Sequence, residues 1–543
     1  MEEIRRRFVS AELDNGMVRV DMRPHTRDIE AMTSVCNGPY TGSYYFLCKY
    51  FDVPVDGETL LTEIAKMQDT DEGSRTYGCS RWYREEPQIR DTNGAFFVYL
   101  PIVEALLFCG EKVSAKEREI IMPVLDRAAV WFAHECEGHG YFYPNKIMSD
   151  GALFLALAKL GTNEEMRKRA YAFWQSWIEY TEKLGWGWGE NTSKVYTRVM
   201  ISALDVALSC LEADEELYAK LFGLRKRLMD YRAYHGENYE FVPSIRTYNF
   251  EGSAITDVAH GASIMALYQR LANELAGKLA PQYEPVPFDE KFHKEHIFGD
   301  SHTFTYKGEN IRLGTVSKFP VMPGSYQNEG WGLGWQSMPV SVLAINHETS
   351  FLRFVSESEG KTRTHPAVDK HSAYLDNAVF AGENIPDMFT VCDQKDNVAV
   401  VVRSISHLAN KCSYIADEWY FQHFDGEIRH HNSWTIMDYG DCVHCIMPLN
   451  GETKVTRDGE KVQITQVMYK GEDKLVTKRF LSTAWAVAVF DKNDGIEAKL
   501  DALGAEYEEI NDLYYSRPVA KPFKIKCGGA ELEFDPDFTC EWR

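Results

Sequence analysis

The segment 243–260 (PSIRTYNFEGSAITDVAH) concentrates side chains that can move protons or bind an anion, among them Arg246 and Tyr248. Asp257 and His260 stand three residues apart on a predicted helix and therefore share one face. A carboxylate in that position can orient an imidazole so that it acts as a base. The alternative interpretation is that His260 is a satisfied core histidine.

A second segment, 185–196 (GWGWGENTSKVY), is a glycine-rich turn that opens another predicted helix. Its Trp186 and Trp188 offer flat rings that suit the C–H faces of sugars. We expect the polar residues in and just after this turn to face the same ligand: Glu190, Asn191, Tyr196 and Arg198. The simpler alternative is that Asn191 or Thr192 only caps the helix.

Two further segments are candidates for substrate binding. In 81–93 (RWYREEPQIRDTN), Arg81 and Arg84 could donate paired hydrogen bonds to a carboxylate. Asn93, a further candidate, precedes the next predicted helix. In 322–336 (MPGSYQNEGWGLGWQ), Tyr326 and Trp331 could close over a cleft. The alternatives are a solvated turn for the first segment and an aromatic seam between domains for the second.

The elements that must position these residues are helical up to about position 277, because apolar residues recur at three- and four-residue spacing. The predicted helices are Thr59–Gln68, Gly94–Cys109, Ala115–Glu135, Lys146–Leu160, Glu164–Leu184, Ser193–Leu211, Glu215–Tyr231 and Ser253–Gly277. Helices 193–211 and 253–271 are apolar or small nearly all round, whereas 164–184 and 215–231 carry charged stripes. This alternation of inner and outer helices predicts an incomplete α/α toroid over residues 1–279, carrying the catalytic cleft.

Residues 280–298 contain three prolines within seven positions and predict an extended linker. Beyond it the hydrophobic period becomes two, with Asp-Gly, Asn-Gly and Lys-Gly turns between the segments. The predicted strands include Asn397–Ile405, Ile428–Met437, Cys442–Leu449, Lys461–Tyr469 and Ala484–Phe490. We therefore expect residues 299–543 to form an antiparallel β-sandwich.

The 543 residues are 44% hydrophobic, carry a formal charge of −22 and include 12 scattered cysteines. Such acidity disfavours nucleic acid and anionic membranes as partners, because both require a basic face. The N-terminus has no apolar stretch behind its charges, and no run approaches the length of a membrane span. Reduced thiols fit the cytoplasm, which is the predicted location. The oligomeric state stays open.

The succession of α/α toroid, Pro-rich linker and β-domain resembles the polysaccharide lyases of the heparinase II/III and alginate-lyase type over nearly the whole chain. That resemblance implies β-elimination on uronic-acid oligosaccharides without a cofactor, or with a divalent cation in place of the neutralising amide. It also implies Asn191 as the neutraliser of the carboxylate, aided by Arg246 or Arg198. His260 would be the base and Tyr248 the acid. Thr192 follows Asn191, where several members have an Asn-His dipeptide.

Two other functions remain open from the sequence. An inverting glycoside hydrolase on the same toroid would use carboxylates across the scissile bond, drawn from Glu190, Glu251 and Asp257. A non-catalytic glycan-binding protein would line its groove with aromatic side chains and have no titratable cluster. The density of polar residues in 246–260 favours an enzyme.

Overall fold

The fold was analysed in a computed structural model. The model describes residues 11–138, 141, 144–183, 190–249, 251–255, 264–279, 283–297, 301–318, 337–365, 387–407, 411–475, 481–492, 494–510 and 522–535. Contacts divide the chain into two units. The helical unit comprises Met1–Lys183, Thr197–Tyr231 and Asp257–Val286, and the sandwich unit comprises Leu184–Tyr196, Arg232–Thr256 and Pro287–Arg543.

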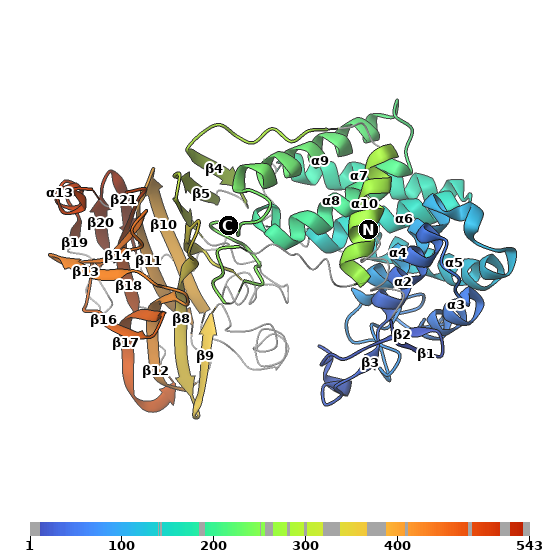
Figure 1. Cartoon of the computed structure of the whole chain (residues 1–543), viewed down its shortest axis with the longest axis horizontal. Coiled ribbons are helices and arrows are strands. Elements are labelled where there is room, and N and C mark those ends of the chain that lie inside the picture. Colours follow the sequence, from blue (N-terminus) through green and yellow to red (C-terminus); the bar gives the residue numbers. More distant parts are fainter. Residues whose placement is uncertain are drawn as a thin grey trace. The chain divides into compact units, whose positions relative to one another are not determined.

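The helices of the helical unit form two layers (Figure 1). Their bounds are α2 Gly38–Phe51, α3 Gly57–Lys66, α4 Gly94–Phe108, α5 Ala115–Gly138, α6 Pro144–Leu160, α7 Glu164–Lys183, α8 Lys194–Ser209, α9 Glu216–His235 and α10 Ile264–Leu279. Helix α2 contacts α4 and α10, and α4 contacts α6, whereas α3 contacts α5 and α5 contacts α7. The hydrogen bond from Lys159 Nζ to the carbonyl of Ser209 (2.9 Å) links α6 to α8. The alternation of inner and outer helices predicted for an α/α toroid is therefore present.

Composition explains which helices lie inside. Nearly every side chain of α4 and α6 is buried, whereas α7 keeps an exposed charged face. Inside the layer the carboxyl group of Glu104 on α4 accepts a hydrogen bond from the hydroxyl of Tyr268 on α10. Burial raises the pKa of Glu104 to about 8. An uncharged carboxyl group therefore joins two inner helices at neutral pH.

Two large antiparallel sheets make up most of the sandwich unit. The six-stranded sheet has the order β10-β11-β18-β15-β14-β13, and the nine-stranded sheet has the order β16-β17-β12-β8-β7-β6-β5-β4, with β9 beside β8. The strands are β4 Phe292–His296, β5 His302–Lys307, β6 Ile311–Val316, β7 Val340–Ala344, β8 Thr349–Ser358, β9 Lys361–His365, β10 Asp387–Lys395, β11 Val398–His407, β12 Lys411–Phe421, β13 Glu427–His431, β14 Trp434–Asp438, β15 Val443–Pro448, β16 Lys454–Asp458, β17 Lys461–Leu475 and β18 Ser482–Phe490.

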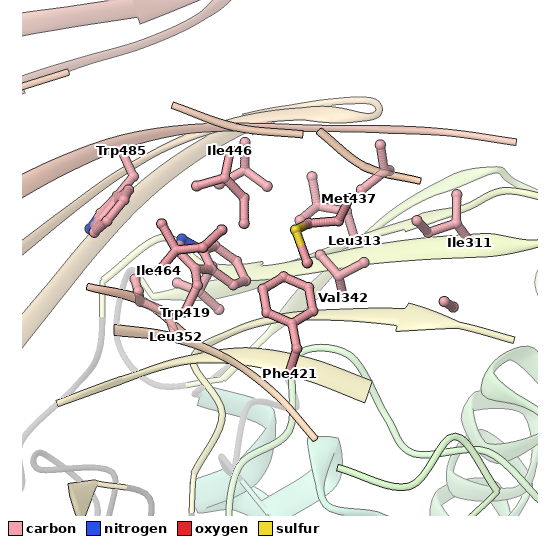
Figure 2. Packing of buried hydrophobic residues seen from close by; sticks show 14 of the residues in the cluster. Ile311, Leu313, Val342, Leu352, Trp419, Phe421, Met437, Ile446, Ile464 and Trp485 are labelled. Carbon is pink, nitrogen blue, oxygen red and sulfur yellow. The ribbon is translucent and has the colours of Figure 1, made fainter. Parts of the chain in front are cut away.

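Apolar side chains from both sheets interlock in one core, which makes this pair a sandwich. Leu352 and Trp419 come from the nine-stranded sheet, and Met437 and Trp485 come from the six-stranded one (Figure 2). Full burial of a large aliphatic or Phe side chain contributes about 1.5–3 kcal/mol. A second cluster packs α13 (Ile496–Asp501) and the small sheet of β19 (Glu506–Glu509), β20 (Phe523–Cys527) and β21 (Ala530–Phe534) on the other face of the six-stranded sheet.

The other face of the nine-stranded sheet is covered by chain that comes from between the helices. The carbonyl of Val242 accepts a hydrogen bond from Thr305 Oγ1 of β5 (2.7 Å). A Cβ on Gly314 of β6 would lie 1.9 Å from the carbonyl carbon of Val242, so only glycine permits this approach. Segments 184–196 and 232–256 therefore belong to the sandwich unit, although helices flank them in sequence.

Three predicted elements need correction. Ser253 and Ile255 lie in isolated bridges, so the helix predicted from Ser253 is observed only from Ile264 onwards. The strand predicted at Ile428–Met437 is a hairpin of β13 and β14, because Asn432 adopts φ 50° and reverses the chain. Part of the predicted 280–298 linker forms β4, which pairs with β5. The domain boundaries at 279/280 and 298/299 stay predictions.

We expect Glu104→Gln to change how the stability of the helical unit depends on pH. The unfolded chain loses the Glu104 proton near its ordinary pKa of 4.5, whereas the folded protein keeps it until about pH 8, so stability falls as pH rises through this window. The variant should therefore gain about 2–4 kcal/mol relative to wild type between pH 5 and pH 8. Urea unfolding followed by the helical circular dichroism signal measures this difference, and a constant difference would contradict the assignment.

For His444 of β15 we expect stability to change with pH in the opposite direction. This side chain is buried between Trp419 and Phe421. Burial lowers the pKa of His444 to about 3. Between pH 6.5 and pH 3 this side chain is therefore protonated in the unfolded chain but neutral in the folded protein. Stability is therefore lost as pH falls from 6.5 towards 3. His444→Gln should reduce this loss by about 2–3 kcal/mol at pH 4.5. Hydrogen exchange of the β15 amides measures the loss of stability at low pH. An equal loss in wild type and variant would refute the role of His444.

Candidate active site

A chain of hydrogen bonds joins the two polar segments that the sequence singled out, and it lies entirely in the sandwich unit. Arg246 Nη1 donates to Glu190 Oε1 (2.7 Å), and Arg246 Nη2 donates to the Tyr196 hydroxyl (2.7 Å). That hydroxyl lies 2.8 Å from the hydroxyl of Tyr248. Glu190 is 0% exposed and Arg246 is 4% exposed, whereas Tyr248 is only half-buried. Tyr248 is therefore the most exposed of these four hydrogen-bonded residues.

The backbone around Arg246 is held on both sides. Arg246 adopts φ 59°, a left-handed conformation that costs a non-glycine residue about 1–3 kcal/mol. Its N–H donates to Ser337 Oγ (3.1 Å), and its carbonyl accepts from Ser193 Oγ (2.9 Å). The same Ser193 Oγ accepts from the N–H of Tyr196 (3.2 Å), so one hydroxyl ties both segments together.

Glu240 fixes the residues that follow Arg246. Its Oε2 accepts a hydrogen bond from Thr247 Oγ1 (2.8 Å), and Thr247 Oγ1 accepts from the N–H of Asn249 (2.9 Å). Burial raises the pKa of Glu240, and the hydrogen bond from Thr247 opposes that shift. Tyr248 is thus flanked by two residues whose positions are set by buried polar contacts.

Asn191 is held by the first strand of the nine-stranded sheet. Its Nδ2 donates to Glu295 Oε1 (3.1 Å) and to the carbonyl of His296 (3.2 Å). Glu295 Oε2 lies 2.9 Å from His293 Nε2, and His293 Nδ1 lies 2.6 Å from Glu290 Oε1. Burial lowers the pKa of His293, but its hydrogen bonds to the two glutamates outweigh this and raise it. The amide of Asn191 therefore points both of its donors at protein acceptors.

The remaining predicted substrate-binding residues that the structure describes lie in the helical unit, whereas Glu251 of the hydrolase alternative is exposed in the sandwich unit. Arg198 is half-buried on α8. Arg81 donates to the carbonyls of Lys66, Met67 and Glu86, and Arg84 pairs with Asp14. Asn93 immediately precedes α4, and its side chain makes no capping hydrogen bond. Substrate binding by these four residues stays a prediction.

Other predicted residues lie outside the described part of the chain. They are the proposed base, its orienter and four aromatic residues: His260, Asp257, Trp186, Trp188, Tyr326 and Trp331. The structure therefore brings together the side chains of Glu190, Tyr196, Arg246 and Tyr248. The side chain of Asn191 is instead bonded to β4.

Within the described ranges, no three or more His, Cys, Asp or Glu side chains are grouped so that they could hold a metal ion. In the same ranges, no helix combines the length and apolar character needed to cross a membrane.

Sequence reasoning missed the residues that fix the site from behind: Glu240, Glu295, His293 and Ser337. Residues 293 and 295 fall in the segment predicted to be a linker. The sequence of β4, FHKEH, has a single apolar residue and therefore lacks the apolar/polar alternation that predicts a strand. No local pattern shows that Glu295 contacts a side chain 104 positions earlier.

Comparison with known proteins gives distant likenesses only. The chain matches no protein-family model. No curated protein matches it either. Among solved structures, heparinase III is 10% identical, with 91% of this chain and 81% of that one covered and a TM-score of 0.46. Chondroitin AC lyase from Streptomyces coelicolor A3, solved with chondroitin sulphate, is 8% identical, with 97% and 82% covered and a TM-score of 0.48.

Endoglucanase CelQ from Clostridium thermocellum, solved with cellotetraose, is also similar, at 8% identity, 81% and 76% coverage and a TM-score of 0.17. Likenesses this distant leave the activity of the present chain to be argued from its own residues.

We expect Arg246→Ala to destabilise the sandwich unit by about 3–5 kcal/mol, because it removes one charge of a buried ion pair and leaves the carboxylate of Glu190 in the interior. The pair Glu190→Gln with Arg246→Met should recover most of this loss, since it removes both charges. Urea unfolding gives the free energies. Lys524→Ala, which removes the exposed partner of Glu533, is the control and should cost less than about 1 kcal/mol. If Arg246→Ala lowers the unfolding free energy as little as the control does, the Arg246–Glu190 ion pair is not desolvated.

Proposed function

We propose that the protein is a lyase that cleaves uronic-acid-containing oligosaccharides by β-elimination. The single observation that carries the proposal is the buried series of hydrogen bonds from Glu190 through Arg246 and Tyr196, which leads to the half-buried residue Tyr248. A phenol placed in this way can give up a proton while a fixed guanidinium stabilises the negative charge left behind.

The reaction needs three contributions from the protein. A donor must quench the charge of the substrate carboxylate, because the neighbouring C5 proton is poorly acidic until that happens. A base must take this proton as the C5–H bond breaks and a C4–C5 double bond forms. An acid must protonate O4, which leaves with the electron pair of the C4–O4 bond. Atoms and electrons balance without an oxidant or reductant.

Tyr248 is assigned the role of the acid, since it is half-buried, whereas its hydrogen-bonded neighbours Tyr196 and Arg246 are buried. When it gives its proton to O4, the Tyr196 hydroxyl can donate to the phenolate, and Arg246 supports Tyr196 in turn. Glu190 keeps the guanidinium in place by pairing with its other nitrogen. His260 remains the proposed base.

Asn191 remains the proposed neutraliser of the carboxylate, with Arg246 or Arg198 as helpers. In the structure both N–H groups of its amide point at Glu295 and at the carbonyl of His296. Binding of a substrate carboxylate must therefore exchange one of these contacts. The glutamate is the better candidate for exchange, because the incoming group is also a carboxylate.

A hydrolase that uses Glu190 is disfavoured. That side chain is 0% exposed, and one of its oxygens accepts a hydrogen bond from Arg246. It therefore cannot reach a glycosidic oxygen without breaking a buried ion pair.

The test is turnover of a panel of uronate oligosaccharides, followed by the ultraviolet absorbance of the unsaturated product. Tyr248→Phe should lower kcat about 10²–10⁴-fold, the usual contribution of one general acid or base, and leave the unfolding free energy within about 1 kcal/mol of wild type. Tyr306→Phe, a half-buried tyrosine of β5 that packs against the sandwich core, is the matched control and should keep full activity. Turnover by Tyr248→Phe close to wild type would remove this tyrosine from the mechanism.

A further inference from the structure

We infer that His293 is a positioning residue that allows the amide of Asn191 to pass from Glu295 to the carboxylate of the substrate. This inference rests on the proposed function, since it concerns how the proposed neutraliser becomes available. Asn191 Nδ2 donates to Glu295 Oε1 (3.1 Å), and Glu295 Oε2 lies 2.9 Å from His293 Nε2. All three residues belong to the sandwich unit, so this series of contacts lies within one unit.

The buried carboxylate of Glu295 is the obstacle to this exchange. Glu295 is 3% exposed. When a substrate carboxylate takes over a hydrogen bond of Asn191, Glu295 loses a donor and also faces a second negative charge. Both changes are costly away from water, because a buried charge needs a partner and a like charge nearby disfavours ionisation. The exchange therefore requires a positive charge that stays bound to Glu295.

The imidazole of His293 can supply that charge, because it lies between two carboxylates. Its Nε2 faces Glu295, and its Nδ1 lies 2.6 Å from Glu290 Oε1. A ring with an acceptor at each nitrogen must donate from both, and only the protonated imidazole does so. Burial lowers the pKa of His293, but the hydrogen bonds and charges of Glu295 and Glu290 outweigh burial and raise it. The imidazolium therefore balances Glu295 before and after the exchange.

The rings packed around His293 carry no charge at neutral pH. The ring centres of Phe288 and Tyr234 lie 4.5 Å and 5.3 Å from that of His293, and burial raises the pKa of Tyr234. His235, on the last turn of α9, is fully buried, and burial together with nearby positive charges lowers its pKa well below the ordinary value. From β5, the residue opposite His293 is Thr305. Protonation of His293 therefore adds a charge that these four neighbours do not supply.

Two cations of the adjoining strands have a different task. Lys307 of β5 donates to the carbonyl of Tyr234 (3.0 Å), and Arg312 of β6 donates to the carbonyl of His235. Carbonyl groups at the C-terminal end of a helix carry partial negative charge and suit such cations. Lys307 and Arg312 therefore balance the end of α9, whereas the imidazolium of His293 balances Glu295.

The test is isothermal titration calorimetry between pH 6 and pH 9 with a tetrasaccharide of glucuronate. Tyr248→Phe serves as the parent protein, so that the ligand is not consumed. The affinity of this protein should fall as pH rises through the raised pKa of His293, because the imidazolium that holds the displaced Glu295 is lost. Adding His293→Gln, which keeps a donor but cannot be charged, should weaken binding about ten- to a hundredfold at pH 6 and abolish the pH dependence.

Glu290→Gln separates this role from a structural one. The Glu290 side chain is 52% exposed, and its charge raises the pKa of His293, so its removal should move the fall in affinity to lower pH. A purely structural loss would weaken binding equally at every pH. His431→Gln removes a histidine from another ion pair, with Asp501 (2.8 Å), and is the matched control. This control should leave the pH dependence unchanged.

The outcomes separate this inference from the proposed function. If wild type turns over the tetrasaccharide but affinity does not change with pH, or His293→Gln keeps the pH dependence, the role of His293 is overturned and the lyase stands. The expected pH dependence without any turnover by wild type would support the role of His293 and count against the lyase. Failure of the Tyr248→Phe protein to bind the tetrasaccharide at any pH would overturn the inference.

Discussion

The buried charge of Arg246 is the constraint on which the candidate site depends. A guanidinium that is 4% exposed is stable only when acceptors surround it, and here Glu190 and the Tyr196 hydroxyl meet that need. Because these partners come from a different segment of the chain, satisfying one charge also fixes the relative position of residues 190–196 and 244–249. The left-handed backbone of Arg246 is tolerated because Ser193 and Ser337 hold it from both sides.

The sheet beneath these segments explains why they can be so polar and yet buried. Strands β4 to β6 present His293, Glu295 and Thr305 to the segments that cover them, and Gly314 removes the side chain that would block close approach. The described part of the site is thus a polar layer between sheet and loop, in which Tyr248 is half-buried and Glu190, Tyr196 and Arg246 are buried. In the proposed mechanism the buried residues set charge and position, and the phenol of Tyr248 acts as the acid.

Sequence patterns predicted α4, α6 and α7 well: α7 has an apolar stripe and a charged face, whereas α4 and α6 are apolar segments too long for strands. Helix α2 was missed, because its sequence GPYTGSYYFLCKYF is rich in glycine, tyrosine and phenylalanine, which are weak helix formers. The site segments were found by the density of polar residues, and the pairing of Arg246 with Glu190 required the fold. Strand β4 was hidden in a proline-rich neighbourhood, so the hold of Glu295 on Asn191 could not be foreseen.

The central claim is that bond cleavage proceeds by elimination and not by hydrolysis. Mass spectrometry of the products formed from a uronate oligosaccharide in heavy-oxygen water tests it most directly. Elimination adds no water to either fragment. The account therefore predicts a new non-reducing end that is unsaturated, free of heavy oxygen and lighter by one water than the corresponding product of hydrolysis. Two saturated fragments, with heavy oxygen bonded at an end formed by the cleavage, would contradict elimination.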